Sequence, residues 1–189
     1  SCAGFGGAIK NLSMGGGTKK SKGDMHEGCK PKLTGNCTAC GTCVSLCPAK
    51  SCSVESGNFV NNEKSCWGCS ICIVKCPEKA LKPKVALFDD LLAQGAYAVV
   101  KAAKKTFCIN IIKRVSKNCD CQSGENPIIA KDVGILFSKD PVAIDNASVD
   151  LINKAEGKDL FNKENHKNPK SQLKYSQDYG IGTLEYELI

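Results

Sequence analysis

The sequence lacks features that several classes of protein require. It contains no run of about eighteen apolar residues, so no transmembrane helix is expected. Arg114 is the sole arginine among 26 basic residues, and aromatic residues make up only 6% of the chain. Nucleic-acid sites favour the forked guanidinium group and use aromatic rings to stack on bases. Nucleic acid is therefore not an expected partner.

The chain also lacks a recognisable start. Its opening, Ser-Cys-Ala-Gly-Phe-Gly-Gly, resembles neither a signal peptide nor a natural N-terminus. We expect further material upstream, either as a missing N-terminal half or on a partner subunit. The 189 residues present are enough for one substantial domain and a small one.

Cysteine, in contrast, is abundant, with 14 residues. Eight of them form two copies of one pattern, Cys37-x₂-Cys40-x₂-Cys43-x₃-Cys47-Pro48 and Cys66-x₂-Cys69-x₂-Cys72-x₃-Cys76-Pro77. This C-x₂-C-x₂-C-x₃-C-P spacing is typical of bacterial ferredoxins, in which the fourth cysteine ligates the other cluster. The sequence therefore predicts two [4Fe-4S] clusters, one bound by Cys37, Cys40, Cys43 and Cys76 and the other by Cys66, Cys69, Cys72 and Cys47.

Two other uses of these cysteines fit less well. Zinc prefers four ligands from two C-x₂-C pairs at longer separation, without a proline after each group. A disulfide framework requires an oxidising compartment and has less regular spacing. Oxygen-labile clusters and six further thiols (Cys2, Cys29, Cys52, Cys108, Cys119 and Cys121) instead favour a reducing, anaerobic cytoplasm.

The positive charge of the chain decreases when the clusters are counted. Eight ligating thiolates and two cluster cores of about +2 each would bring the formal charge of +7 to about +3. Lys19, Lys20 and Lys22 are interpreted as a solvated face, with docking of an acidic redox partner as the alternative.

Hydrophobic patterning divides the chain into three segments. Residues 1–33 and 84–189 are expected to form one α/β (α+β) domain, into which residues 34–83 insert as a bacterial ferredoxin-type 2[4Fe-4S] module. The patterns predict helices at 8–14, 85–105, 141–155 and 169–179, strands at 106–112, 133–137 and 184–188, and a hairpin at 52–60. Asp140 and Pro141 are expected to begin the third helix, and the strand at 133–137 to be buried. Glycines at 4, 6 and 7 are interpreted as a tight turn, with an anion-binding loop as the alternative.

Several motifs together resemble one family. They are residues 6–12 (Gly-Gly-Ala-Ile-Lys-Asn-Leu), Met25-His26 before the module, the double cysteine motif, Asp120 between two cysteines, residues 132–136, residues 140–145, Gly180-Ile-Gly and residues 185–188. On these motifs the chain resembles the C-terminal half of the iron–sulfur proteins called domain of unknown function 362. The resemblance implies an inserted two-cluster module and leaves the chemistry of the flanking segments open.

Cys119-Asp120-Cys121 is the other segment with chemical content. Two thiolates at i and i+2 can face one metal if the backbone turns, and His26 and Cys29 would complete a tetrahedral site. Asp132 and Asp145 are candidate oxygen ligands. A redox-active thiol pair is the alternative, and for Asp145 the alternative is a hydrogen bond to nearby backbone. Cys52 and Cys108 are interpreted as small core residues, whereas polar neighbours make a core position unsuitable for Cys119 and Cys121. His166 is interpreted as an exposed side chain.

Three functions are compatible with these patterns. The first is electron transfer through two [4Fe-4S] clusters, with the chain as a domain or subunit of an anaerobic redox system and with a redox partner protein or complex. The second is an iron–sulfur oxidoreductase with a further metal or substrate site near Cys119 and Cys121, whose catalytic residues and substrate are unknown. The third is an assembly or scaffold subunit in which the clusters are structural.

Overall fold

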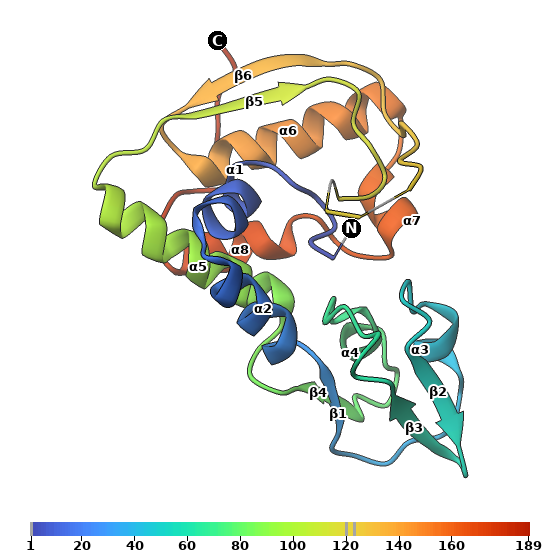
Figure 1. Cartoon of the computed structure of the whole chain (residues 1–189). Helices are drawn as coiled ribbons and strands as arrows, with labels where there is room; N and C mark the ends of the chain where they lie inside the picture. The colour runs from blue at the N-terminus through green and yellow to red at the C-terminus, as the bar shows by residue number, and fades with distance from the viewer. Residues whose placement is uncertain (1, 120, 123) are drawn as a thin grey trace. The chain divides into compact units, whose positions relative to one another are not determined.

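The structure is a computed structural model that describes residues 2–119, 121–122 and 124–189. Two compact units are present (Figure 1). The α+β unit comprises Ala3–Thr18 and Leu92–Ile189, and the cysteine-loop unit comprises Lys19–Leu91. No helix in the described part of the chain is long and apolar enough to span a membrane.

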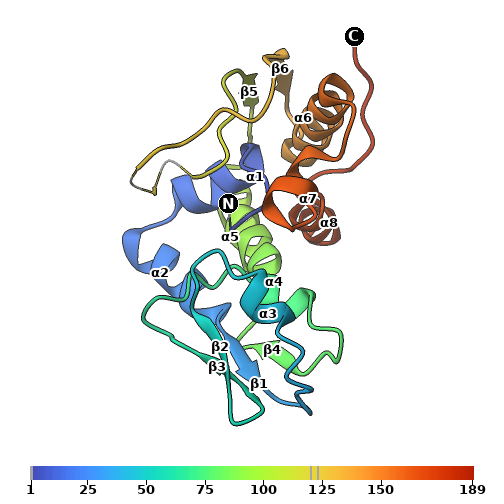
Figure 2. The same ribbon diagram turned by 90° about the vertical axis from the view of Figure 1, so that its right-hand side faces the viewer.

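The cysteine-loop unit contains two antiparallel strand pairs. β1 (Pro31–Leu33) pairs with β4 (Leu81–Pro83), and β2 (Cys52–Glu55) pairs with β3 (Asn58–Asn61). Two short helices, α3 (Thr42–Ser45) and α4 (Ile71–Val74), lie within the two cysteine runs and contact each other (Figure 2). The predicted hairpin at 52–60 is confirmed, with Ser56 and Gly57 at its turn in the left-handed region.

This unit extends beyond the predicted module. Helix α2 (Lys19–Gly28) and the first turn of α5 (Phe88–Ala103) belong to it, although the sequence placed residues 19–33 and 84–91 in the other domain. Val85 N–H donates to the carbonyl of Gly28 at 2.8 Å, and the His26 and Phe88 rings lie 5.1 Å apart. A side chain at Gly28 would press against Leu91. These contacts join α2 and the start of α5, the two flanking segments, to each other. Periodicity alone does not encode this contact between segments distant in sequence.

The α+β unit is built on one hairpin and one buried helix. β5 (Cys108–Ile112) and β6 (Gly134–Ser138) pair antiparallel, and α6 (Pro141–Glu156) packs against both strands (Figure 1). The predicted start of α6 is confirmed, because Asp140 accepts hydrogen bonds from the N–H groups of Val142 and Ala143. Helices α7 (Leu160–Asn165) and α8 (Ser171–Asp178) complete the unit, and Gly180 with φ +71° follows α8.

Two strand predictions need correction. The strand at 133–137 is not buried, since Ile135 and Phe137 are 57% and 62% exposed and pair with the equally exposed Ile111 and Ile109. The alternate residues of the two strands, among them Asn110, Ile112 and Leu136, face α6 instead. The apolar run at 133–137 therefore does not indicate a buried strand. The predicted strand at 184–188 does not form. Side chains bind its backbone instead, because Asn146 donates to the Leu184 carbonyl and Gln177 accepts from the Leu184 N–H.

The N-terminal segment is held inside the α+β unit. Helix α1 (Ala8–Lys10) continues into a π-helical turn, η1 (Asn11–Gly15). The fully buried Asp145 carboxylate accepts from the N–H groups of Ala8 and Ile9 at 2.7 and 2.9 Å, and from Asn110 Nδ2 at 2.8 Å. Burial raises the pKa of Asp145 to about 6, although these hydrogen bonds favour the carboxylate. Asp145 is therefore a capping residue of a helix remote in sequence.

Candidate functional site

Four cysteines line one cavity of the cysteine-loop unit. They are Cys37, Cys40, Cys43 and Cys76. The first two lie in the loop before α3, the third lies within α3, and the fourth lies two residues after the end of α4. Val54, Phe59 and Leu81 supply apolar walls to the same cavity. The cavity thus joins three neighbours in sequence with the last cysteine of the other run.

A second cavity has the reciprocal composition. Cys66, Cys69 and Cys72 line it together with Cys47, the last cysteine of the first run. Cys52 of β2 also lines this cavity, and it is buried. The sequence predicts Cys52 only as a small core residue, because no spacing rule relates it to either run. Each cavity is therefore lined by the first three cysteines of one run and the fourth cysteine of the other. Crossed ligation of two clusters requires this grouping.

The backbone repeats in the two runs. Gly41 precedes α3 with φ +74°, and Ser70 precedes α4 with φ +63°. Ala39 and Gly68, two residues earlier in each run, are also left-handed, with φ of +56° and +63°. Left-handed residues turn successive peptide groups toward one side of a loop. Each short loop can therefore present its sulfur atoms and amide groups to one volume.

Backbone amide groups donate hydrogen bonds to sulfur atoms of the motif cysteines. The Ala39 N–H donates to Cys37 Sγ at 3.4 Å, and the Gly68 N–H donates to Cys66 Sγ at 3.5 Å. Cys47 Sγ accepts from the Ser51 N–H at 3.3 Å. Hydrogen bonds of this kind stabilise ligating thiolates and help set the reduction potential of an iron–sulfur cluster.

The donor set fits a cubane cluster in each cavity. Among the residues that the structure describes, no three histidine, cysteine, aspartate or glutamate side chains form a group that could hold a single metal ion. The four thiolates of a [4Fe-4S] cluster each bind a different iron, so they lie further apart than four ligands of one ion. Four thiols, apolar walls and N–H donors to sulfur are the groups that such a cluster requires.

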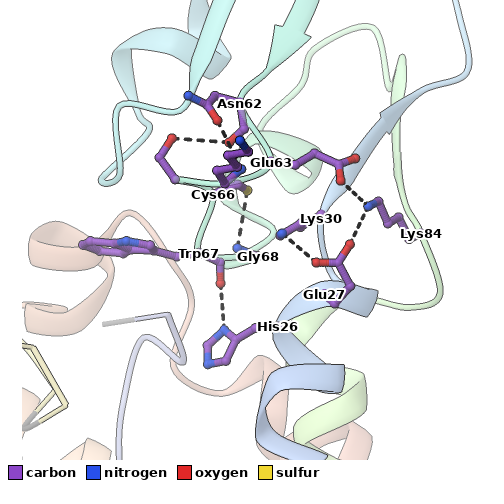
Figure 3. Close-up of polar contacts among 11 residues, drawn as sticks. His26, Glu27, Lys30, Asn62, Glu63, Cys66, Trp67, Gly68 and Lys84 are labelled. Carbon is purple, nitrogen blue, oxygen red and sulfur yellow. Dashed lines mark hydrogen bonds and ion pairs between the residues drawn. The ribbon is translucent and has the colours of Figure 1, made fainter. Parts of the chain in front are cut away.

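Helix α2 packs against the second cysteine loop (Figure 3). His26 Nδ1–H donates to the carbonyl of Trp67 at 2.7 Å, which places His26 beside the loop between Cys66 and Cys69. A Cβ atom at Gly68 would overlap the His26 carbonyl oxygen, so only glycine allows this approach. His26 therefore contacts the cysteine loop twice, with its ring at Trp67 and with its carbonyl group at Gly68.

An ion-pair network lies beside this contact (Figure 3). Glu27 binds both Lys30 and Lys84, with N–O distances of 2.6 and 2.5 Å, and Lys84 also binds Glu63 at 2.7 Å. Hydrogen bonds from Lys30 and Lys84 lower the pKa of Glu27 to about 2. The network joins α2, the segment after β4 and the segment that precedes Cys66. It therefore helps to fix the orientation of α2 against these segments.

We expect Gly68→Ala to destabilise the cysteine-loop unit by about 3 kcal/mol, because it combines a left-handed backbone with a collision against α2. Gly41→Ala is the matched control, since Gly41 has a similar φ but no atom within 4 Å of its Cβ position. Strain alone should cost the control about 1 kcal/mol. Urea unfolding of anaerobically prepared protein measures both. Equal losses in the two variants would contradict the close packing of α2 on this loop.

A larger cavity, of about 550 Å³, lies within the α+β unit. Its walls come from the first glycines of the chain, α1, η1, β5 and the segment that follows β5. Four basic residues line it (Lys10, Lys113, Arg114 and Lys117), and no aspartate or glutamate is among its described lining residues. The cavity therefore has the size and charge of a site for a small anion.

Cys119 lies in the wall of this cavity beside Cys121. The Cys121 thiol donates to Cys119 Sγ at 2.8 Å, and Lys10 Nζ donates to the same sulfur at 3.1 Å. Burial opposes ionisation of Cys119, but hydrogen bonds from Cys121 and Lys10 lower its pKa overall. Burial and the neighbouring Cys119 raise the pKa of Cys121. Cys119 is therefore the more acidic thiol of the pair.

The other proposed ligands of a third metal are placed elsewhere. His26 and Cys29 belong to the cysteine-loop unit, where His26 binds Trp67 and Cys29 is fully buried. Asp132 accepts from the Arg114 N–H, and Asp145 caps α1. These residues do not form a metal-binding group with Cys119 and Cys121 in the described part of the chain. Asp120 lies outside the described residues.

Sequence reasoning missed Lys10 as a partner of Cys119. The glycine-rich opening predicts a tight turn, with an anion-binding loop as the alternative, and no pattern in the sequence connects it to the cysteine pair. More than one hundred residues separate Lys10 from Cys119. The one hint in the sequence was a lysine at the end of a short helix that follows two glycines. This hint did not indicate that the group bound by the lysine would be the Cys119 thiolate.

The fold and the cavities thus define an α+β protein with a separate unit that contains two similar cysteine loops. The chain belongs to the family called domain of unknown function 362, whose sequence profile matches residues 1–150. That the chain corresponds to the C-terminal half of such proteins stays a prediction. No match was found among curated proteins or among solved structures.

Proposed function

We propose that this protein transfers electrons through two [4Fe-4S] clusters held by a ferredoxin-type module. Cys37, Cys40, Cys43 and Cys76 would hold one cluster, and Cys66, Cys69, Cys72 and Cys47 the other. The observation that carries the proposal is the reciprocal membership of the two cysteine-lined cavities. When bound, such clusters supply one-electron chemistry, typically near −400 mV or below, as the ligand set suggests.

The chain's own residues would bind and tune this chemistry. The eight thiolates provide the bonds, while the N–H groups of Ala39, Ser51 and Gly68 donate to sulfur. Phe59 and Leu81 exclude water from one side of the first cavity. Cys40 is exposed, so the edge of that cavity is accessible to a redox partner. Such labile ligation also supports a reducing compartment, as in an anaerobic cytoplasm.

The α+β unit supports a second candidate function, a cluster-fed oxidoreductase. The supporting observation is the 550 Å³ basic cavity with Cys119 in its wall. A pure electron carrier has no use for such a cavity. Both candidate functions require clusters that are reduced at physiological potentials. If the clusters were only structural, they would not be reduced at such potentials.

Anaerobically purified protein is expected to contain about eight iron and eight sulfide per chain, because both tetrads are complete. Chemical analysis of iron, sulfide, zinc and nickel measures the stoichiometry, and electron paramagnetic resonance of the reduced protein identifies the clusters. Film voltammetry should show reversible reduction near −400 mV. Four iron per chain, or zinc in the eight-cysteine motif, would contradict the proposal. Clusters reducible only outside physiological potentials would support the scaffold role.

A further inference from the structure

The Cys119–Cys121 pair has the geometry of an exchange centre. Its sulfur atoms lie 2.8 Å apart, so disulfide formation requires them to approach by less than about 1 Å. Lys10 Nζ lies 3.1 Å from Cys119 Sγ, where an ammonium group stabilises a thiolate. The pair therefore combines a charge-stabilised nucleophile with a second thiol in contact.

The position of the pair indicates what it would react with. Cys119 is in the cavity wall, whereas Cys121 is exposed and is not a lining residue. The cavity has room for a small organic molecule. Lys117 of the lining pairs with Glu164 at 3.1 Å. The other basic lining residues, Lys10, Lys113 and Arg114, favour a negatively charged occupant.

We propose that Cys119 and Cys121 form a thiol–disulfide exchange couple whose substrate is a small anionic disulfide, or the corresponding thiol in reverse, bound in this cavity. The proposal is independent of the clusters, because every group that it uses belongs to the α+β unit.

Two exchanges complete the reaction. The Cys119 thiolate attacks one sulfur of the bound disulfide, whose S–S bond breaks, leaving a mixed disulfide and releasing the first thiolate. Cys121 then loses its proton to the released thiolate or to water and attacks the Cys119 sulfur. The Cys119–Cys121 disulfide forms and the second thiolate leaves. The protein dithiol loses two electrons, which reduce the substrate to two thiols.

Cys108 provides an internal comparison. It belongs to the same unit, but it is buried and does not line the cavity. Burial and the carboxylates of Asp145 and Asp140 raise the pKa of its thiol. Cys108 should therefore stay reduced under conditions in which Cys119 and Cys121 are oxidised.

Three disulfides of similar size and different charge test the proposal: dithiodiglycolate (anionic), hydroxyethyl disulfide (neutral) and cystamine (cationic). Anaerobic holoprotein is treated with each, alkylated and digested with trypsin. One tryptic peptide, residues 118–131, contains Cys119 and Cys121 and no other cysteine, so its loss of two mass units reports the new disulfide. Rates are normalised to the same reagent acting on the synthetic 118–131 peptide. We expect the anionic reagent to exceed the cationic one about tenfold, with the order weakened by salt.

Variants assign the roles. Cys121→Ser should stop the reaction at a mixed disulfide on Cys119, and Cys119→Ser should give no product at either position. Lys10→Met should slow the exchange about three- to tenfold, whereas Lys105→Met, which removes an exposed charge outside the cavity, should not. Cluster absorbance recorded in the same samples separates failure here from failure of the iron–sulfur proposal. A flat or reversed charge order, a mixed disulfide on Cys121, or one zinc per chain that blocks alkylation of this peptide would overturn the proposal.

Discussion

Cys47→Ser is expected to remove the cluster held by Cys66, Cys69 and Cys72, and to spare the cluster of its own sequence neighbours. Cys47 lines the second cavity and not the first, although it lies only four residues after Cys43. Iron should fall from about eight to about four per chain, because one of two ligand sets is incomplete. Cys76→Ser is the reciprocal variant and should remove the other cluster.

Two double variants separate crossed from local ligation. If Cys47 shares a cluster with Cys69, the double replacement of both should lose no more iron than either single one, whereas joint replacement of Cys47 and Cys40 should remove nearly all of it. Local ligation within each run predicts the reverse pattern. Iron per chain and resonance spectra decide between them, with circular dichroism to verify that each protein is folded. Four iron retained in the Cys40/Cys47 variant would contradict the crossed arrangement.

The sequence anticipated the β2–β3 hairpin of the cysteine-loop unit. This hairpin depends on a local rule, because its turn contains Gly57 in the left-handed region. Asp140 and Pro141 likewise specified the start of α6, because a cap and its helix are adjacent in sequence. Local chemistry of this kind can be predicted from a few residues.

Other features depend on contacts that no local pattern contains. The exposed face of β6 could not be predicted, because an apolar run does not show whether a second layer covers it. The residues after Thr183 have the pattern of a strand, but side chains of α6 and α8 occupy the N–H and carbonyl groups of Leu184. These groups are then not available to a neighbouring strand. The boundary of the cysteine-loop unit depends on the packing of α2 and α5.

The candidate site in the α+β unit shows the same division. Spacing drew attention to Cys119 and Cys121, and the structure places their sulfur atoms in contact. Ligand chemistry also grouped them with His26 and Cys29, but these two residues belong to the cysteine-loop unit. The residue that Cys119 does contact is Lys10, whose position depends on how the N-terminal segment is held against α6.

That attachment leads to the last prediction, that Asp145→Ala will destabilise the α+β unit by about 3 kcal/mol or more. The substitution leaves the N–H groups of Ala8 and Ile9 and the Asn110 amide without their buried acceptor. Asp145→Asn preserves volume but turns an N–H₂ group toward a donor, so most of the loss should remain. Asp150→Ala, on the same helix, is the control. Its partially exposed bonds to Lys170 and Tyr186 should contribute less than about 1 kcal/mol. Urea unfolding measures all three, and alkylation of Cys119 reports the site. If Asp145→Ala costs no more than Asp150→Ala, the N-terminal segment is not held by this carboxylate, and the position of Lys10 beside Cys119 loses its structural basis.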